Sequence, residues 1–410
     1  MKQRQLYRTL ETVASKKFET EKELLIEILN QIVTDNNIDV TGGRLWKLDT
    51  EKQGYRLLYQ TGNVPKINPD FILLISENPI FELISKERTV LADETNHYLI
   101  KKGIFKYSAS GIGSKKRIDD QPFYEYMLAV NSIEVEEELR NNLNVIATLL
   151  TSKIKDRRVA DSRKELMSDL DEAKELQRSI LPDHEYHFND YDIFGVTVPA
   201  KIMSGDYFDY LEFGSDDQRL GIVVGDAASK GASAAAEAMY ISGAIRMAVN
   251  FEIKISALLN NLNQIINKMF SDDRFTTLFF GEITNNKNGL FLYANAGHNP
   301  PIFYSEQKDE IKYLGTTGPL LGPAPKSKYH TDSINIKVGD ILVIYSDGIV
   351  EAADVNFDFY EEKKLEAIIR ENKDLMPKEI AYKILDDVSK FSKNGKYNDD
   401  KTLVIIKRHK

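Results

Sequence analysis

The sequence predicts an α+β protein with a strand-rich C-terminal half, in which two packed sheets are flanked by helices. Residues 191–410 carry runs of short strand patterns that are interrupted by pairs of helices, not a regular strand–helix alternation. Residues 139–180 place apolar side chains at helical spacing. The residues up to about 130 mix helical and strand patterns, which is typical of a compact α/β domain.

The composition is that of an ordinary globular protein, with 42% apolar and 29% charged residues among 410. This length allows two or three domains. No apolar run reaches the roughly eighteen residues of a membrane span, and the first residues lack a secretory signal. The absence of cysteine excludes disulfides, thiolate metal sites and cysteine nucleophiles. We therefore expect a cytoplasmic protein.

The charge balance argues against nucleic acid as a partner. The formal net charge is -9, and the basic residues form no concentrated stripe. Nucleic-acid binding needs a concentrated positive field. Clustered carboxylates instead attract divalent cations.

The front region predicts helical stretches followed by two short strands. Leu6, Leu10 and Val13, which lie outside the residues that the structure describes, have helical spacing. Strand patterns at 43–48 and 55–59 are separated by a polar turn at 49–54. The preceding helix has an apolar face formed by Leu24, Leu25, Ile28, Leu29 and Ile32.

The middle region predicts a helix that ends at Leu181, because Pro182 disfavours helical geometry in the residue before it. Two apolar seams lie on either side of a polar interval at 155–164: Leu139, Leu143, Ile146 and Leu150, then Leu166, Leu170, Ala173 and Ile180. Such seams fit a two-stranded coiled coil or an amphipathic helix packed on its own domain. We favour the coiled coil, and with it a homodimer, because the helix links two domains.

The C-terminal region predicts eight strands and four helices. The strand patterns cover 192–198, 207–213, 220–224, 277–283, 289–295, 333–338, 341–346 and 402–406. The helical patterns cover 232–250, 255–270, 360–371 and 377–391.

Aspartates stand at the mouths of several of these strands, beside small residues. They are Asp206 and Asp209 in Ser-Gly-Asp-Tyr-Phe-Asp, Asp226 after Val-Val-Gly, Asp347 before Gly-Ile-Val, and Asp399 and Asp400 before Lys-Thr-Leu. A single aspartate there is usually a turn former. Several together repel one another unless a cation lies between them. Because no cysteine is present, a hard cation such as Mg²⁺ or Mn²⁺ fits best, and two such ions about 4 Å apart can activate water against a phosphate ester.

The motifs together resemble those of PPM-type phosphatases, and within them the bacterial SpoIIE/RsbU branch. The resemblance covers about residues 175–407. It rests on the ordered segments 175–182, 204–209, 224–231, 296–301, 345–352 and 399–403. It implies an αββα sandwich with two Mn²⁺ or Mg²⁺ ions between the sheets.

Motif position also implies a role for each aspartate. Asp226 would bridge both ions, and Ala227 would offer its backbone carbonyl. Asp347 and Asp399 would hold one ion, and Asp206 would hold or orient the other. These four aspartates are therefore the expected catalytic residues.

Several other polar residues in these motifs also have an expected role, and some of them have two interpretations. Asp400 is expected behind the metal ligands, and Asp209 either there or at a strand edge. His298 can serve as the general acid, although a structural role in a turn explains this residue more simply. Lys201 and Lys230 can attract phosphate or be solvated. Ser229 stands where the family usually has glycine, which alters a turn and not a ligand.

The resemblance further implies a protein serine/threonine phosphatase that acts on a phosphorylated STAS-type anti-sigma-factor antagonist in a partner-switching pathway. A catalytically silent scaffold is the alternative from another class, and a metal-dependent phosphodiesterase or nucleotide phosphatase is a third. The expected domains are a GAF-like sensory domain at 1–150, a coiled-coil-like linker at 151–182 and the phosphatase at 183–410. The sensory signal would be a small molecule or a protein. Trp46, Tyr59 and Phe71 fit a ligand pocket or plain core packing equally well.

Overall fold

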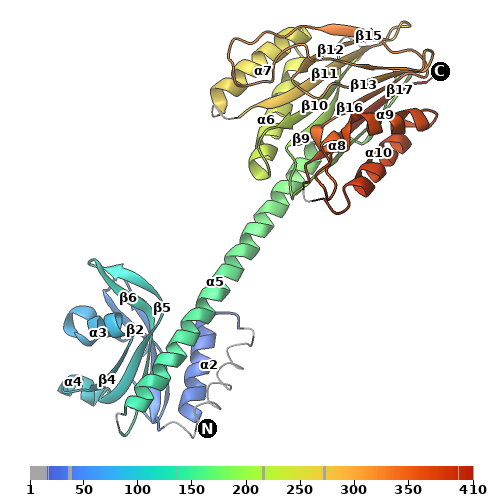
Figure 1. The fold of residues 1–410 in the computed structure, drawn as a ribbon. Coiled ribbons are helices and arrows are strands. Elements are labelled where there is room, and N and C mark those ends of the chain that lie inside the picture. Colours follow the sequence, from blue (N-terminus) through green and yellow to red (C-terminus); the bar gives the residue numbers. More distant parts are fainter. Residues whose placement is uncertain are drawn as a thin grey trace. The chain divides into compact units, whose positions relative to one another are not determined.

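The computed structural model divides the chain into two compact units, Met1–Leu166 and Met167–Lys410. The division falls within one long helix, α5 (Glu137–Ile180), so both units include part of it (Figure 1). The structure describes residues 16, 18–35, 39–134, 136–214, 218–270, 274–395 and 397–409.

The N-terminal unit is built on an antiparallel sheet. Its six described strands lie in the order β3-β2-β1-β6-β5-β4. The two strands predicted at 43–48 and 55–59 are confirmed as β1 and β2, which pair in antiparallel register. The elements are α2 (Glu21–Thr34), β1 (Gly42–Asp49), β2 (Gly54–Gly62), β3 (Ile72–Leu74), η1 (Ile75–Glu77), α3 (Ile80–Glu87), β4 (Thr89–Asp93), α4 (His97–Lys101), β5 (Lys106–Ile118) and β6 (Gln121–Asn131).

The first half of α5 packs on its own unit together with α2. The first predicted seam of α5 is buried with the apolar face of α2 and with side chains of β1, β5 and β6. The buried seam residues are Leu139, Leu143, Ile146 and Leu150. The coiled-coil interpretation is therefore wrong for this seam, because its apolar stripe already covers a sheet face. The second seam differs, since Leu166 is exposed.

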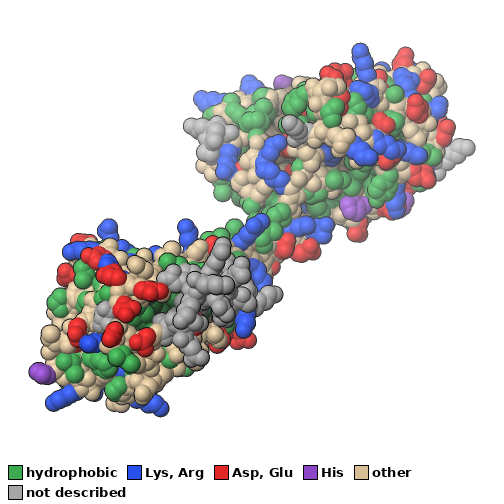
Figure 2. Space-filling model, turned by 60° about the horizontal axis from the view of Figure 1, so that its bottom comes forward, with side chains coloured by type: hydrophobic (Ala, Val, Ile, Leu, Met, Phe, Trp, Pro, Cys, Tyr) green, Lys and Arg blue, Asp and Glu red, His purple; other side chains and the backbone are tan. Residues whose placement is uncertain are grey.

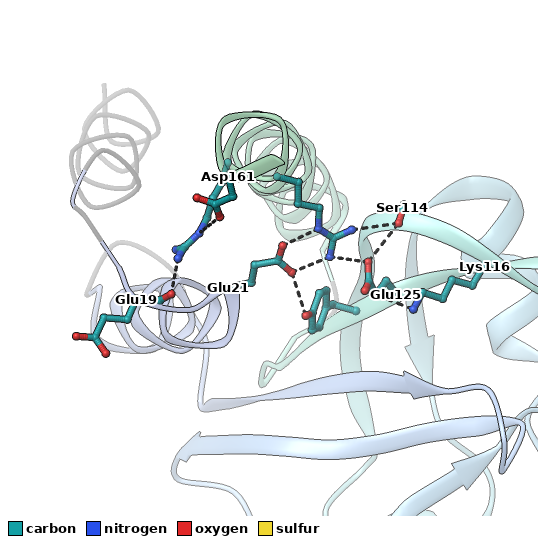
Figure 3. A network of polar contacts seen from close by, with 9 residues as sticks. Glu19, Glu21, Ser114, Lys116, Glu125 and Asp161 are labelled. Carbon is teal, nitrogen blue, oxygen red and sulfur yellow. Dashed lines mark hydrogen bonds and ion pairs between the residues drawn. The ribbon is translucent and has the colours of Figure 1, made fainter. Parts of the chain in front are cut away.

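A charged network fastens α5 to α2 and to the sheet (Figure 3). Arg158 of α5 reaches Glu21 of α2 at 2.6 Å and Glu125 of β6 at 2.8 Å. Tyr126 donates to Glu21 at 3.1 Å. Hydrogen bonds to both carboxylates raise the pKa of Arg158. The guanidinium of Arg158 thus forms ion pairs with one carboxylate from α2 and one from β6.

The C-terminal unit contains two antiparallel sheets that pack face to face. Their described strands lie in the orders β15-β12-β11-β10-β9 and β14-β13-β16-β17-β8-β7. The strands are β7 (Glu185–Phe188), β8 (Tyr191–Val198), β9 (Asp206–Phe213), β10 (Arg219–Ala227), β11 (Thr276–Thr284), β12 (Leu290–Ala296), β13 (Ile302–Ser305), β14 (Glu310–Tyr313), β15 (Asp332–Asn335), β16 (Ile341–Tyr345) and β17 (Lys401–Arg408). Side chains from both sheets share one apolar core, which includes Phe208, Phe279 and Ile344.

Helices cover the outer face of each sheet. The pair α6 (Ala232–Val249) and α7 (Ile255–Met269) packs on the first sheet. The short α8 (Asp347–Val350), with α9 (Glu361–Glu371) and α10 (Pro377–Phe391), packs on the second. The layers therefore run helix, sheet, sheet, helix, as the strand and helix patterns predicted.

The described surface mixes both signs of charge. Figure 2 shows Lys and Arg side chains interspersed with Asp and Glu on the face of each unit that it presents. Within the described parts of the chain, every helix is too short or too polar to cross a membrane.

Candidate active site

Two carboxylates face each other at one end of the first sheet. Asp206 begins β9, and Asp226 lies directly opposite it on β10. Opposing cross-strand side chains stand about 4.5–5.5 Å apart at Cβ, and like charges there are destabilising. Asp206 is only 2% exposed, and its Oδ2 has no hydrogen-bond partner. The pair thus holds negative charge in a buried position.

The pKa values of the two carboxyls reflect this crowding. Burial first, and then the charge of Asp226, raise the pKa of Asp206 well above its ordinary value. Burial and the charge of Asp347 raise the pKa of Asp226 to about 7, although a hydrogen bond from Asp206 opposes the shift. A nearby cation would remove the repulsion and favour both charged forms.

The second sheet supplies further carboxylates to the same place. Asp347 begins α8 directly after β16, and Asp399 precedes β17. Burial, Glu351 and then Asp399 raise the pKa of Asp347 to about 6. The charge of Asp399 also raises the pKa of Asp226. The two sheets therefore bring the four predicted aspartates into one electrostatic group.

Asp399 is engaged by neighbouring side chains. Lys230 lies 2.5 Å from Asp399 Oδ2, and Tyr397 donates to the same oxygen at 3.1 Å. Lys230 is thus an ion-pair partner of Asp399, and its side chain is still half exposed. Ala227 follows Asp226 at the end of β10 and is buried, with its N–H 3.4 Å from the carbonyl of Gly205.

Asp400 anchors the loop that leads into β9. Its carboxylate accepts hydrogen bonds from the N–H of Ala200 at 2.7 Å and of Gly205 at 2.7 Å. It also accepts from the Ser204 hydroxyl at 2.9 Å. Asp400 therefore fixes the backbone just before Asp206, which accords with the position behind the ligands that the motifs predict.

Asp209 does not join the group. Arg246 of α6 binds it through two nitrogens, at 2.6 and 3.0 Å. The same guanidinium donates to the carbonyl of Ile180 at the end of α5. Asp209 thus lies on β9, the edge strand of its sheet, and its side chain ties β9 to α6.

His298 is a buried neutral residue of a turn. It is 1% exposed, its Nδ1 lies 2.9 Å from the Thr277 hydroxyl, and its N–H donates to Asn295 at 2.8 Å. Burial lowers the pKa of His298 to about 4. The structured turn is therefore the interpretation that the geometry favours.

Gln177 of α5 holds the active-site loop, a role that the helical sequence pattern around it does not indicate. Its Nε2 donates to the carbonyl of Ser204 at 2.6 Å, and its Oε1 accepts from the N–H of Ser204 at 3.2 Å. Gln177 is 8% exposed. The end of α5 thus contacts the backbone two residues before Asp206.

A basic cavity adjoins Asp206. Its volume is about 490 Å³. Lys174 and Arg178 of α5 line it together with Lys201, Ser204 and Asp206. Three cationic side chains beside a carboxylate group provide a place where a phosphate can bind next to cations.

The donor set suits hard cations. Within the described ranges, no three His, Asp or Glu side chains are gathered tightly enough to enclose an ion as they lie here. However, Asp206 has a buried oxygen without a partner, and it faces Asp226 across the β9–β10 pair. Oxygen donors of this kind suit Mg²⁺ and Mn²⁺. The residues therefore fit the predicted ions, while the full ligand set remains a prediction.

Comparison with known proteins agrees with this architecture. The family model of stage II sporulation protein E (SpoIIE) matches residues 216–409. The phosphoserine phosphatase RsbU of Bacillus subtilis is 29% identical over 246 residues, which are 60% of this chain and 72% of RsbU. Protein IcfG of Synechocystis is 30% identical over 54% of this chain and 38% of its own length.

Among solved structures, the SiaA-PP2C domain of Pseudomonas aeruginosa superposes with a TM-score of 0.52 at 18% identity. The match covers 61% of this chain and all of that domain, so the two share a fold. Residues 216–409 thus match the SpoIIE family model, the C-terminal unit has the fold of a PP2C domain, and the comparisons support an enzyme of the serine/threonine phosphatase class.

Proposed function

We propose that the C-terminal unit hydrolyses phosphoserine and phosphothreonine in a protein substrate, with two Mn²⁺ or Mg²⁺ ions. Asp226 would bridge the ions with the carbonyl of Ala227, Asp347 and Asp399 would hold one, and Asp206 the other. The observation that carries this proposal is the group of one buried and three partly buried carboxylates where the two sheets meet. When bound, such ions polarise a phosphoryl group and supply a nucleophilic water at neutral pH.

The residues around the group would orient it and attract the substrate. Asp400 and Gln177 both hold the loop before Asp206, so the Asp206 side chain is positioned from two directions. Lys174, Arg178 and Lys201 line the adjoining cavity and would attract a phosphoryl group. Because these cations lie on one side of Asp206, the phosphate ester would enter from the end of α5.

The substrate is proposed to be a phosphorylated STAS-type anti-sigma-factor antagonist, so that the output would be partner switching. RsbU, a phosphoserine phosphatase by name, supports the phosphoserine class. The N-terminal unit, with a GAF-like domain proposed at 1–150, would sense a signal. The linker at 151–182 would carry this signal to the phosphatase at 183–410.

A homodimer through the second half of α5 is part of this proposal. Val159, Leu166, Met167 and Leu176 are exposed apolar residues of the helix. A second copy of the helix would cover them. Gln177 and Arg246 would then connect a change in this helix to the loop before Asp206 and to β9.

The substrate class is tested by comparing phosphate release from a phosphoserine protein, a phosphotyrosine peptide and ATP, each with Mn²⁺ and with chelator. We expect Mn²⁺-dependent release from the phosphoserine protein at a rate well above the other two. Preferred hydrolysis of ATP would instead favour a nucleotide phosphatase. Binding of the phosphoprotein without turnover would favour the scaffold.

A further inference from the structure

Arg44 is a buried cation in the N-terminal unit. It lies on β1 and is 2% exposed. Burial lowers the pKa of Arg44 to about 10, so the guanidinium stays charged at neutral pH. An ion buried without a partner of opposite charge is strongly unfavourable, so the surroundings of Arg44 need explanation.

The hydrogen bonds of Arg44 go to neutral acceptors. Its Nη1 donates to the carbonyl of Gly103 at 3.1 Å and to Asn131 Oδ1 at 3.2 Å. Its Nη2 donates to the carbonyls of Pro65 at 2.9 Å and Lys102 at 3.2 Å. The buried Nε has no partner. Among the residues that the structure describes, no carboxylate forms an ion pair with Arg44. One donor is thus left without a partner, and the positive charge faces only the dipoles of neutral acceptors.

Arg44 lines a small apolar cavity in the core between the sheet and the helices α3 and α4. The cavity volume is about 30 Å³. A water molecule needs about 10–15 Å³ of such space, so the cavity exceeds one water. The apolar and aromatic lining includes Trp46, Phe81, Ile84, Leu99, Ala109 and Met127. A polar end at Arg44 therefore adjoins an apolar interior.

We propose that this cavity binds a short-chain monocarboxylate, such as acetate or propionate. The carboxylate would accept the hydrogen bond from Arg44 Nε and neutralise the guanidinium, and the alkyl end would lie among the apolar side chains. A dianion does not fit, because one cation faces the cavity and the other polar lining groups are neutral. A larger ligand does not fit the volume. A neutral ligand leaves the charge of Arg44 uncompensated.

Trp46 provides a direct readout, because it is the single tryptophan of the chain, is 1% exposed and lines the cavity. Its fluorescence in the full chain would be titrated with sodium acetate and sodium propionate at constant ionic strength. Acetamide and propionamide serve as uncharged controls of the same shape. We expect a saturable change with the carboxylates and none with the amides. A linear response, or equal responses to acid and amide, would mean that the cavity holds only water.

Two variants distinguish the contribution of the Arg44 charge to binding from that of the cavity volume. Arg44→Gln removes the charge and should weaken propionate binding by at least about tenfold, since hydrogen bonds to charged groups are among the stronger ones. Ala109→Val fills the cavity and leaves Arg44 in place, so it should abolish the saturable change. Ala109→Val also keeps the test decisive if Arg44→Gln does not fold.

Arg56→Gln is the matched control, because Arg56 lies on the neighbouring strand β2 and pairs with Asp49 and Asp70. It should bind propionate as the wild type does. Each variant is compared after its Trp46 spectrum and cooperative thermal transition show that it is folded. Unchanged propionate binding in folded Arg44→Gln or in folded Ala109→Val would overturn the proposal.

Discussion

Asp206 and Asp226 lie directly opposite each other across the β9–β10 pair, whereas Lys230 is bound to Asp399. Two facing carboxylates in a buried position reduce the stability of the metal-free fold. A destabilising pair of this kind occurs at functional sites, where the chemistry of the site requires it.

This relationship predicts that Asp226→Asn stabilises the metal-free C-terminal unit by about 1 kcal/mol, because it replaces one of two crowded carboxyls, whose pKa values burial and neighbouring charge raise, with a neutral amide. Mn²⁺ should add little to the stability of this variant, whereas it should stabilise the wild type through binding to the folded state. Calorimetry in chelator and in Mn²⁺ measures both effects. Asp386→Asn, on the exposed face of α10, should change neither. Equal Mn²⁺ stabilisation of Asp226→Asn and wild type would contradict this prediction.

Gln177 is predicted to position the loop that carries Asp206. Gln177→Ala removes both bonds to the Ser204 backbone and leaves those groups buried without a partner, which costs about 1–3 kcal/mol. We expect a higher Mn²⁺ concentration for half-maximal activity and a lower kcat. Mn²⁺ titration of phosphatase activity measures this. The control is Ser179→Ala, whose hydroxyl bonds only to the carbonyl of Leu176. A normal Mn²⁺ requirement in Gln177→Ala would count against the role.

Arg158 is predicted to stabilise the N-terminal unit. Arg158→Ala leaves the largely buried Glu21 and Glu125 without their shared cation. The expected loss is about 1–3 kcal/mol, below the value for a fully buried pair because Arg158 is itself 39% exposed. Urea unfolding followed by Trp46 fluorescence reports this unit alone. Arg157→Ala, whose partner Asp161 is 71% exposed, should cost much less. If both variants lost the same unfolding free energy, the ion pairs of Arg158 with Glu21 and Glu125 would not be the cause of the destabilisation.

His298 predicts a pH dependence of stability. Its folded pKa of about 4 lies below the unfolded value near 6.5, so the unfolded chain binds the proton first as the pH falls. The C-terminal unit should therefore lose up to about 3 kcal/mol between pH 6.5 and pH 4 through this residue. His298→Asn should remove that part of the slope. The comparison uses calorimetric unfolding of both proteins at several pH values, and parallel curves would show that His298 does not titrate as described.

Much of the C-terminal fold could be predicted from sequence because its strands are short apolar runs with clear boundaries. The predicted strand at 220–224 lies within β10, and the predicted helix at 377–391 has the bounds of α10. The end of α5 at Ile180 lies one residue before the prediction, since Pro182 sets it locally. Local signals of this kind do not depend on tertiary contacts.

The residues that contact each side chain could not be predicted from sequence, because they depend on the tertiary fold. A stripe such as Leu143 and Ile146 is the same pattern whether a second chain or its own α2 covers it. Asp209 shares a motif with Asp206, yet an arginine distant in sequence, Arg246, takes it out of the carboxylate group. The buried Arg44 stands in an ordinary strand pattern, and only the fold reveals that no described carboxylate pairs with it.

The most direct test of the central claim is Mn²⁺-dependent hydrolysis of a small aryl phosphate by wild type, Asp226→Asn and Asp386→Asn. Asp226→Asn should lower kcat by about a thousandfold or more while its fold is retained, because electrostatic stabilisation of the transition state is lost. Asp386→Asn should match the wild type. Unchanged turnover in folded Asp226→Asn would contradict the assignment of the carboxylate group as the catalytic centre.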